Sequence, residues 1–235
     1  MLIEHQVDRA WPLADVVLAL GADGRPIDVG RPDEVLARSA GAMRDAGIWL
    51  PAPAEDMDGA PALAITAPGP IGPVVVRAAD VRFGYDRASP VVRDLSIQAS
   101  AGERIALVGP NGSGKSTLAR LLVGLLRPDR GTVHLRGSDP SRLPPASLAR
   151  HAGYVFQEPE RQFLAQRVAD EVCLGLTPDE LARVDELMTR LGLPLGEFGE
   201  RSPYRLSGGE QRRLSLACVL IRGLSSCDRK VASSE

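Results

Sequence analysis

The hydrophobic and polar positions along the chain predict a mixture of strands and helices. Short apolar runs at residues 15–20 and 104–108 have the length and composition of buried parallel strands. Residues 132–137 alternate between polar and apolar side chains, which predicts a half-exposed strand. Other short runs rich in apolar residues are strand candidates, at residues 2–5, 74–76, 81–83, 95–98 and 152–156.

Five regions are predicted to be helical, one of them a short helix near residues 147–150. Pro32 opens a helix that runs through Arg44, with acidic residues in its first turn. Residues 118–126 are compatible with helix. Residues 166–200 are predicted to be helical and carry a core-facing apolar stripe. Ser207 can cap a helix through Arg222, with Glu210 at its third position as in a capping box. The stripe consists of Leu181, Val184, Leu187, Met188 and Leu191.

Composition divides the chain into four parts. Residues 1–50 carry two strand candidates and one helix, which is too little to bury a core alone. Residues 51–73 contain six prolines among alanine, glycine and acidic residues, so we predict an extended linker. Residues 74–222 carry the main pattern of strands and helices. The polar residues 223–235 follow no pattern and are expected to be disordered.

The overall composition excludes several classes of protein. The chain has 235 residues, of which 44% are hydrophobic and 25% charged, as in globular proteins. A net charge of −2 argues against a surface for nucleic acid. We find no signal peptide and no apolar run of the roughly eighteen residues that cross a bilayer. The three cysteines have no metal-ligand spacing, so we expect a reducing cytoplasm.

One stretch carries specific chemistry. Residues 109–117 read GPNGSGKST, which matches the phosphate-binding loop pattern G-x-x-x-x-G-K-[ST]. The glycines let backbone N–H groups turn toward phosphate oxygens, and the N-terminus of the following helix adds partial positive charge. Lys115 would reach the β- and γ-phosphates of a nucleotide, and the Ser116 hydroxyl would bind Mg²⁺. The candidate nucleotide-binding residues here are Gly109, Asn111, Gly112, Gly114, Lys115, Ser116 and Thr117.

An ordinary glycine-rich turn is the alternative interpretation of this stretch. The strand candidate at 104–108 and the helix candidate at 118–126 flank it on both sides, as a phosphate loop requires. We therefore prefer the phosphate loop.

A second motif carries a resemblance to a known family. Residues 206–212, LSGGEQR, resemble the signature sequence of the ATPases of ABC transporters. Ser207 and the backbone N–H groups of Gly208 and Gly209 lie at a predicted helix start, where they can form an anion site. The resemblance implies that this site closes on the γ-phosphate held by an opposite ATPase domain. Taken alone, the motif would be a plain helix cap.

Three further positions agree with this resemblance. Tyr85 is similar to the family's aromatic residue that stacks on adenine. Gln157 resembles the glutamine that contacts Mg²⁺ and links the nucleotide site to the membrane subunit. His5 resembles the switch histidine that contacts the γ-phosphate, a role that its surroundings favour over that of a structural or solvated histidine. Gln157 and His5 are the candidate catalytic residues, and Ser116 and Gln157 are the candidate Mg²⁺ ligands.

The resemblance implies an α/β fold of the ABC ATPase type. That P-loop NTPase fold has an antiparallel β subdomain, a parallel-sheet core and a helical subdomain. Residues 1–50 resemble the end of one such domain and residues 74–222 the front of a second, joined by the linker 51–73. Residues 158–163 look most like the energy-coupling-factor importers, whose tandem ATPases have this layout and which take up vitamins and transition-metal ions.

The resemblance also implies ligands, partners and a location. ATP and Mg²⁺ are the expected ligands. A second ABC ATPase domain and a transmembrane subunit are the expected partners, with no nucleic acid. The expected location is peripheral, at the cytoplasmic face of the cell membrane.

The chain departs from the family after the signature helix. An ABC domain needs an apolar strand there that ends in Asp-Glu, with the Asp holding Mg²⁺ through water and the Glu acting as general base. No such run follows residue 206, and no strand pattern precedes Asp228. We therefore expect an incomplete sheet, with one edge of the strand at 104–108 unpaired. We interpret the chain as a fragment, ending in a shift of reading frame near Arg222.

Three hypotheses for function follow. The first is the ATP-binding subunit of an energy-coupling-factor importer, which couples ATP binding and hydrolysis to uptake of a vitamin or metal ion. The second is a truncated remnant that binds nucleotide without hydrolysing it, because the Asp-Glu pair is missing. The third is a soluble ABC ATPase of DNA repair or translation, and no feature of the sequence supports it. Whether the chain is an ATP hydrolase is left open by the sequence.

Overall fold

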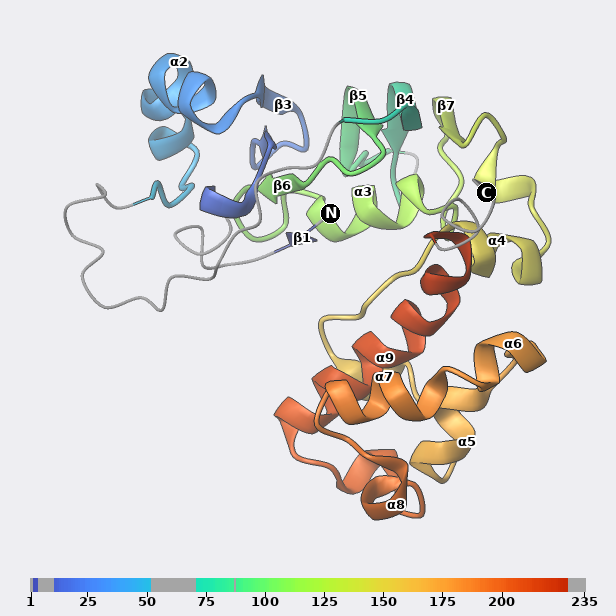
Figure 1. The fold of residues 1–235 in the computed structure, drawn as a ribbon. Coiled ribbons are helices and arrows are strands. Elements are labelled where there is room, and N and C mark those ends of the chain that lie inside the picture. The colour runs from blue at the N-terminus through green and yellow to red at the C-terminus, as the bar shows by residue number, and fades with distance from the viewer. Residues whose placement is uncertain (1, 4–10, 52–70, 87, 228–235) are drawn as a thin grey trace. The chain divides into compact units, whose positions relative to one another are not determined.

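The computed structural model describes residues 2–3, 11–51, 71–86 and 88–227 (Figure 1). The chain divides into two compact units, Met1–Leu143 and Pro144–Glu235, which we call the first and the second unit. His5 and most of the predicted linker lie outside the described residues.

All strands of the described residues lie in the first unit. In chain order, its elements are β1 (Leu2–Ile3), η1 (Trp11–Leu13), β2 (Val16–Leu20), β3 (Pro26–Gly30), α2 (Pro32–Asp45), β4 (Val74–Phe83), β5 (Val92–Ser100), β6 (Ile105–Val108), α3 (Lys115–Leu122), β7 (Arg130–Leu135) and η3 (Pro140–Arg142). The strands form two sheets, with the orders β1-β6-β2-β3 and β5-β4-β7.

The first sheet is built around β6, the strand that leads into the predicted phosphate loop. β1 pairs with β6 in parallel on one edge, with Leu2 opposite Ala106. β2 pairs with β6 in parallel on the other edge, with Val17 also opposite Ala106. The prediction that one edge of this strand lacks a partner is therefore wrong, because strands from the first twenty residues occupy both edges. β3, which the pattern did not predict, adds an antiparallel edge strand to β2.

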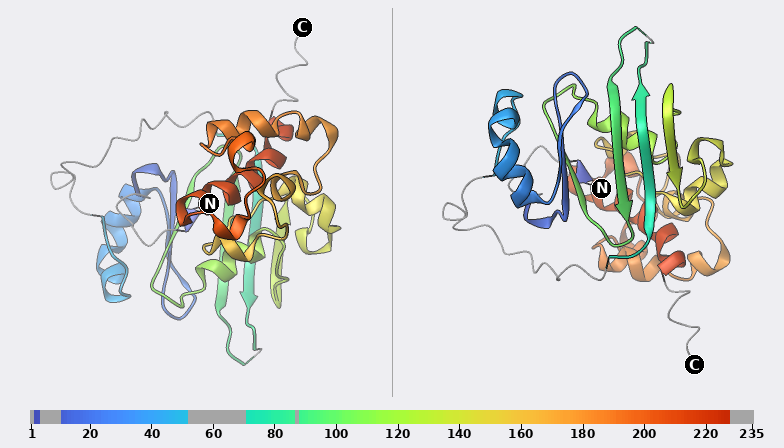
Figure 2. Two further views of the ribbon diagram at one scale, coloured as in Figure 1. Left: turned by 90° about the horizontal axis from the view of Figure 1, so that it is seen from below. Right: turned by 90° about the horizontal axis from the view of Figure 1, so that it is seen from above.

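The second sheet is antiparallel, and its strands lie side by side in the right-hand view of Figure 2. β4 is a single strand of ten residues where the pattern predicted two short ones. Its pairing register with β5 shifts between Ala78 and Val81. Asp80, in that interval, has a positive φ of 49°. This irregularity breaks the alternation of side chains and explains why the sequence suggested two strands.

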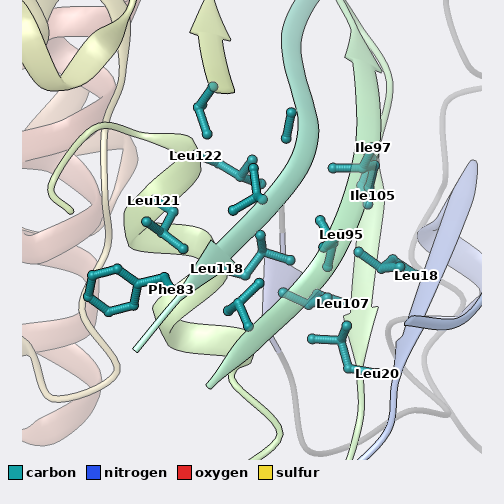
Figure 3. Close-up of a cluster of buried hydrophobic side chains, with 14 residues drawn as sticks. Leu18, Leu20, Phe83, Leu95, Ile97, Ile105, Leu107, Leu118, Leu121 and Leu122 are labelled. Carbon is teal, nitrogen blue, oxygen red and sulfur yellow. The ribbon is translucent and has the colours of Figure 1, made fainter. Parts of the chain in front are cut away.

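The parallel strands bury side chains on both faces of the first sheet. On one face Leu18 and Leu107 join the core that also contains side chains of β4, β5 and α3 (Figure 3). On the other face Val17 and Val108 pack in a cluster with Met43 of α2. Burial on both faces explains why these two strands are continuous apolar runs.

The second unit is helical in its described part. Its elements are α4 (Pro145–His151), η4 (Pro159–Arg161), α5 (Val168–Cys173), α6 (Pro178–Leu181), α7 (Val184–Arg190), α8 (Leu195–Phe198), η5 (Pro203–Arg205) and α9 (Gly208–Cys227). Along the described residues of the whole chain, no helix is long and apolar enough to pass through a bilayer.

Two predictions for this unit need correction. Residues 152–156 form no strand; instead, Tyr154 and Phe156 pack edge to face with ring centroids 4.9 Å apart. The described part of the unit offers no strand with which this segment could pair. The helix that begins after Ser207 continues to Cys227, beyond its predicted end at Arg222.

The apolar stripe is confirmed for Val184, Leu187 and Met188, which are buried, whereas Leu181 is exposed.

Candidate nucleotide-binding site

The loop between β6 and α3 is a tight turn shaped by glycines. Gly112 and Gly114 have φ values of 83° and 90°, a left-handed conformation that favours glycine. A Cβ atom at Gly114 would lie 2.8 Å from the carbonyl oxygen of Val91. A Cβ atom at Gly109 would lie 2.6 Å from the Ser113 hydroxyl oxygen. The backbone of the loop therefore lies closer to its neighbours than a side chain would permit.

Lys115, the first residue of α3, folds its ammonium back over this loop. Its Nζ donates hydrogen bonds to the carbonyl oxygens of Gly109, at 2.7 Å, and Pro110, at 2.8 Å. The residue is only 7% exposed. Burial lowers the pKa of the Lys115 ammonium below its usual value. Two carbonyl dipoles thus hold a desolvated cation against the loop that is predicted to bind phosphate.

Several polar groups at the start of α3 fit a phosphate group with its Mg²⁺. The Ser113 hydroxyl is fully buried and has no hydrogen-bond partner among the described residues. α3 begins after Gly114, and no described side chain caps it. The N–H groups of its first turn can therefore donate hydrogen bonds to an anion. Ser116, in the same turn, is half-buried and carries the hydroxyl oxygen that Mg²⁺ would take.

Tyr85 lies beside the first turns of α3. Its hydroxyl is 3.4 Å from the hydroxyl oxygen of Thr117 and accepts a hydrogen bond of 3.5 Å from Arg120. The Tyr85 and Phe83 rings pack edge to face, with centroids 5.2 Å apart. Tyr85 is still 64% exposed, so part of its aromatic surface can receive a flat ligand. The sequence reasoning missed Arg120, although it lies three residues after Thr117 and thus on the same helix face.

Ser207, the second predicted anion site, caps α9 in the second unit. The predicted capping box is confirmed. The Ser207 backbone N–H and hydroxyl donate to the Glu210 carboxylate at 2.7 and 2.8 Å, and the Glu210 N–H donates to the Ser207 hydroxyl at 3.4 Å. These hydrogen bonds lower the pKa of the Glu210 carboxyl. Gly208 and Gly209 follow as exposed residues in the first turn of α9.

Gln157 lies in a segment that α9 holds from one side. Arg212 donates to the Gln157 carbonyl oxygen at 3.4 Å. Further along the segment, the Ser215 hydroxyl donates to the Gln162 side-chain oxygen at 2.7 Å. The glutamine segment and the signature helix of the second unit are therefore joined by hydrogen bonds.

A buried carboxylate holds the end of the same segment. Glu171 of α5 is 4% exposed and accepts hydrogen bonds from the backbone N–H groups of Leu164 and Ala165, both at 2.7 Å. The sequence reasoning missed this residue. Its only signal is an acidic side chain at an otherwise apolar position of a predicted helix.

The candidate residues therefore fall into separate groups. Tyr85 and residues 109–117 meet within the first unit, and Gln157 and residues 207–209 lie in the second. His5 lies outside the described residues. The roles of all these residues in ligand binding stay predictions.

Comparison with known families decides the classification. The family model described as ABC transporter matches residues 92–225. The chain belongs to the ABC transporter family. The matched region contains both the loop at 109–117 and the motif at 206–212.

Relatives within the ABC transporter family include archaeal and bacterial proteins. A putative ABC transporter ATP-binding protein of Pyrococcus furiosus is 38% identical over 152 residues, covering 62% of this chain and 57% of that protein. The energy-coupling factor transporter ATP-binding protein EcfA1 of Lacticaseibacillus paracasei is 39% identical over 153 residues, covering 62% of this chain and 54% of that protein. The chain thus spans about half the length of the curated relatives it matches.

A solved structure shares the ABC ATPase fold. The structure of cbiO1 from Clostridium perfringens, described as part of the ABC transporter complex cbiONQ, has a TM-score of 0.54 and 27% sequence identity to this chain. The match covers 64% of this chain and 62% of that one. The α/β fold of the ABC ATPase type that the sequence predicted is therefore confirmed.

Proposed function

We propose that the chain is the ATP-binding subunit of an ABC importer of the energy-coupling-factor type, which couples ATP binding and hydrolysis to transmembrane uptake of a vitamin or metal ion. The observation that carries the proposal is the loop at 109–117, with the buried Lys115 ammonium held over it. The family match supports a transporter ATPase, and the names of EcfA1 and cbiO1 support the importer class.

In this proposal the first unit binds the nucleotide. The N–H groups of the loop and of the first turn of α3 bind the phosphate oxygens, and Lys115 exchanges its two carbonyl partners for phosphate. The adenine ring stacks on the exposed part of Tyr85. Ser116 is the residue of the first unit that would hold Mg²⁺, and Gln157 is the candidate ligand from the second unit. The ion, when bound, offsets the charge of the phosphates.

The second unit recognises partners in this proposal. Ser207, Gly208 and Gly209 bind the γ-phosphate held by an opposite ABC ATPase domain, since a helix start with exposed glycines admits an anion. The segment at 157–163 contacts a transmembrane subunit, and its hydrogen bonds to α9 give a physical connection between this contact and the signature motif. His5 acts as the switch histidine. The protein then works at the cytoplasmic face of the membrane.

Comparing ATP with inorganic tripolyphosphate tests the adenine-binding role of Tyr85. The Tyr85→Ala variant is expected to bind ATP roughly 10-fold more weakly, because a base stacked on an aromatic ring contributes about 1–3 kcal/mol. Its affinity for tripolyphosphate, which has no base, should stay within about twofold of the wild type. Isothermal titration of the full chain with each ligand in the presence of Mg²⁺ measures both values.

The Tyr85→Phe variant is the matched control. It retains the ring and loses only the hydroxyl that contacts Thr117 and Arg120, so its ATP affinity should remain near the wild-type value. Equal losses of ATP and tripolyphosphate affinity in Tyr85→Ala would show that the ring does not contact the base.

One sequence observation favours the second candidate function, nucleotide binding without hydrolysis. No apolar run ending in Asp-Glu follows residue 206, so this chain offers no evident carboxylate to act as general base. If this second candidate holds, the purified chain binds ATP with Mg²⁺ but releases no phosphate above the background of a Lys115→Ala variant. A steady-state phosphate-release assay measures this. Mg²⁺-dependent turnover that disappears in Lys115→Ala would contradict it and restore the hydrolysing subunit.

A further inference from the structure

The turn and strands at residues 16–30 reach the phosphate loop, although they lie far from it in the chain. β2 pairs with β6 in parallel, up to Ala19 opposite Val108. At the next position, a Cβ atom at Gly109 would lie 2.8 Å from the Leu20 carbonyl oxygen. The end of β2 is therefore in backbone contact with the first residue of the loop.

A second link runs through Val91 and connects the turn between β2 and β3 with Gly114, the residue before α3. Gly24 has a φ of 77°, and a Cβ atom there would lie 1.9 Å from the Val91 carbonyl oxygen. The Gly24 carbonyl oxygen accepts a hydrogen bond of 3.0 Å from the backbone N–H of Arg93. The same Val91 carbonyl oxygen lies 2.8 Å from the Cβ position of Gly114. Gly24 and Gly114 therefore both lie against the Val91 carbonyl group, and a side chain at either position would be too close to its oxygen.

Charged hydrogen bonds fix this segment to the start of β6. The Asp15 carboxylate accepts three hydrogen bonds from Arg104: from the backbone N–H at 2.7 Å, from Nε at 3.0 Å and from Nη2 at 2.9 Å. These bonds hold the pKa of the Asp15 carboxyl below its usual value. Arg104 directly precedes β6, so the strand is anchored at its start by Asp15 and contacted at its end by Leu20.

We propose that residues 15–24 are a positioning segment of the phosphate loop, and that Gly24 is a positioning residue that acts through Val91. Gly24 lies against the Val91 carbonyl group, which in turn lies against Gly114. Because Gly24 has no side chain, the Val91 carbonyl group can lie close to it. The position of Val91 then limits the position of Gly114, and Gly114 determines the direction of the N–H groups at the start of α3. This proposal rests on the proposed binding of nucleotide at the loop. It makes the first part of the chain a component of the nucleotide site.

Substituting Gly24 with alanine tests the proposal in the full-length chain. The added methyl group cannot fit against the Val91 carbonyl, so the turn must move and Val91 must follow. We expect Gly24→Ala to bind ATP about tenfold more weakly in the presence of Mg²⁺. We also expect the backbone amide resonances of Gly109 and Gly114 to shift in heteronuclear NMR spectra without nucleotide. A role confined to folding would leave those two resonances in place.

Gly41→Ala is the matched control. Gly41 lies in α2 of the same part of the chain, and a Cβ atom there would meet nothing within 4 Å. Alanine in a helix interior is favourable, so this variant should bind ATP as the wild type does and leave the Gly109 and Gly114 resonances unchanged. All variants are compared well below their melting temperatures, so that only folded protein is measured.

The outcomes separate this proposal from the proposed function. Unchanged ATP affinity and unchanged Gly109 and Gly114 resonances in folded Gly24→Ala would overturn the positioning role. If Lys115→Ala binds ATP as tightly as the wild type, the proposed function fails, whereas the amide shifts still decide the positioning role. If Gly24→Ala does not fold, Asp15→Asn replaces it. That variant keeps the backbone contacts but weakens the link to Arg104, so it should shift the same resonances and reduce ATP affinity by a smaller factor.

Discussion

Replacing Lys115 with alanine is expected to weaken the binding of ATP with Mg²⁺ by roughly 10- to 100-fold. A hydrogen bond that involves a charged group contributes about 1.5–3 kcal/mol, and 1.4 kcal/mol corresponds to a tenfold change in affinity. The Lys115 ammonium is already desolvated and lies at the loop, so little rearrangement precedes its contact with phosphate. Isothermal titration of the full chain with ATP measures the effect.

Arg127→Ala is the control for the lost charge. Arg127 is an exposed cation in the same unit, shortly after α3. Its removal should change ATP affinity by less than about twofold, because exposed charges are screened. If the two variants lose the same affinity, the effect is one of net charge, and the loop does not bind phosphate through Lys115.

The second large effect is expected for Leu118→Ala, which should lower the free energy of unfolding of the first unit by about 2–5 kcal/mol. Leu118 is fully buried where α3 meets the core shared with Leu95 and Leu107 (Figure 3). Shortening it leaves a cavity beneath the helix that begins at the phosphate loop. Both tryptophans of the chain, Trp11 and Trp49, lie in the first unit. Urea denaturation followed by tryptophan fluorescence therefore reports on this unit.

Leu125→Ala makes the same chemical change at a site that is 49% exposed. Its effect should stay below about 1 kcal/mol. A loss in Leu118→Ala no greater than in Leu125→Ala would mean that α3 is not packed on the sheet as the structure has it.

The parts of the fold that the sequence predicted well depend on local signals. The apolar run before residue 109, the glycines of the loop and the helix after it are neighbours in the chain, and the structure has them as β6, a left-handed turn and α3. The helix predicted from Pro32 to Arg44 is α2, one residue longer. The capping box at Ser207 and Glu210 is formed as predicted.

Two local predictions failed because the neighbours of a segment decide its structure. β3 was missed because Pro26, Asp28 and Gly30 are poor strand formers, yet pairing with β2 makes the segment a strand. Residues 152–156 have strand-like alternation but find no strand partner in the described part of their unit. Intrinsic preference is a weak guide at such positions.

Contacts between distant parts of the chain could not be predicted from residue pattern. Nothing in residues 2–3 or 16–20 indicates that both strands pair with β6, and the expectation of an unpaired edge failed for that reason. Within the site, the motif predicted Lys115 but not its two carbonyl partners. Helix spacing could place Arg120 on the face of Thr117, but not against Tyr85, which lies 35 positions away in the chain.

The paired strands β2 and β6 are synthesised at different times, because they lie far apart in the chain. Asp15 and Arg104 are 89 residues apart, so the ribosome releases β2, β3 and α2 long before the strand that they flank. α2 can cover Val17 early, because both belong to the cluster on one face of the sheet. Leu18 and Leu20 face the other way, into a core whose remaining members are translated later. The buried partners that cover Leu18 and Leu20 in this core are therefore synthesised at least 58 residues later, and an apolar face that waits for its partners is prone to aggregation and to capture by chaperones.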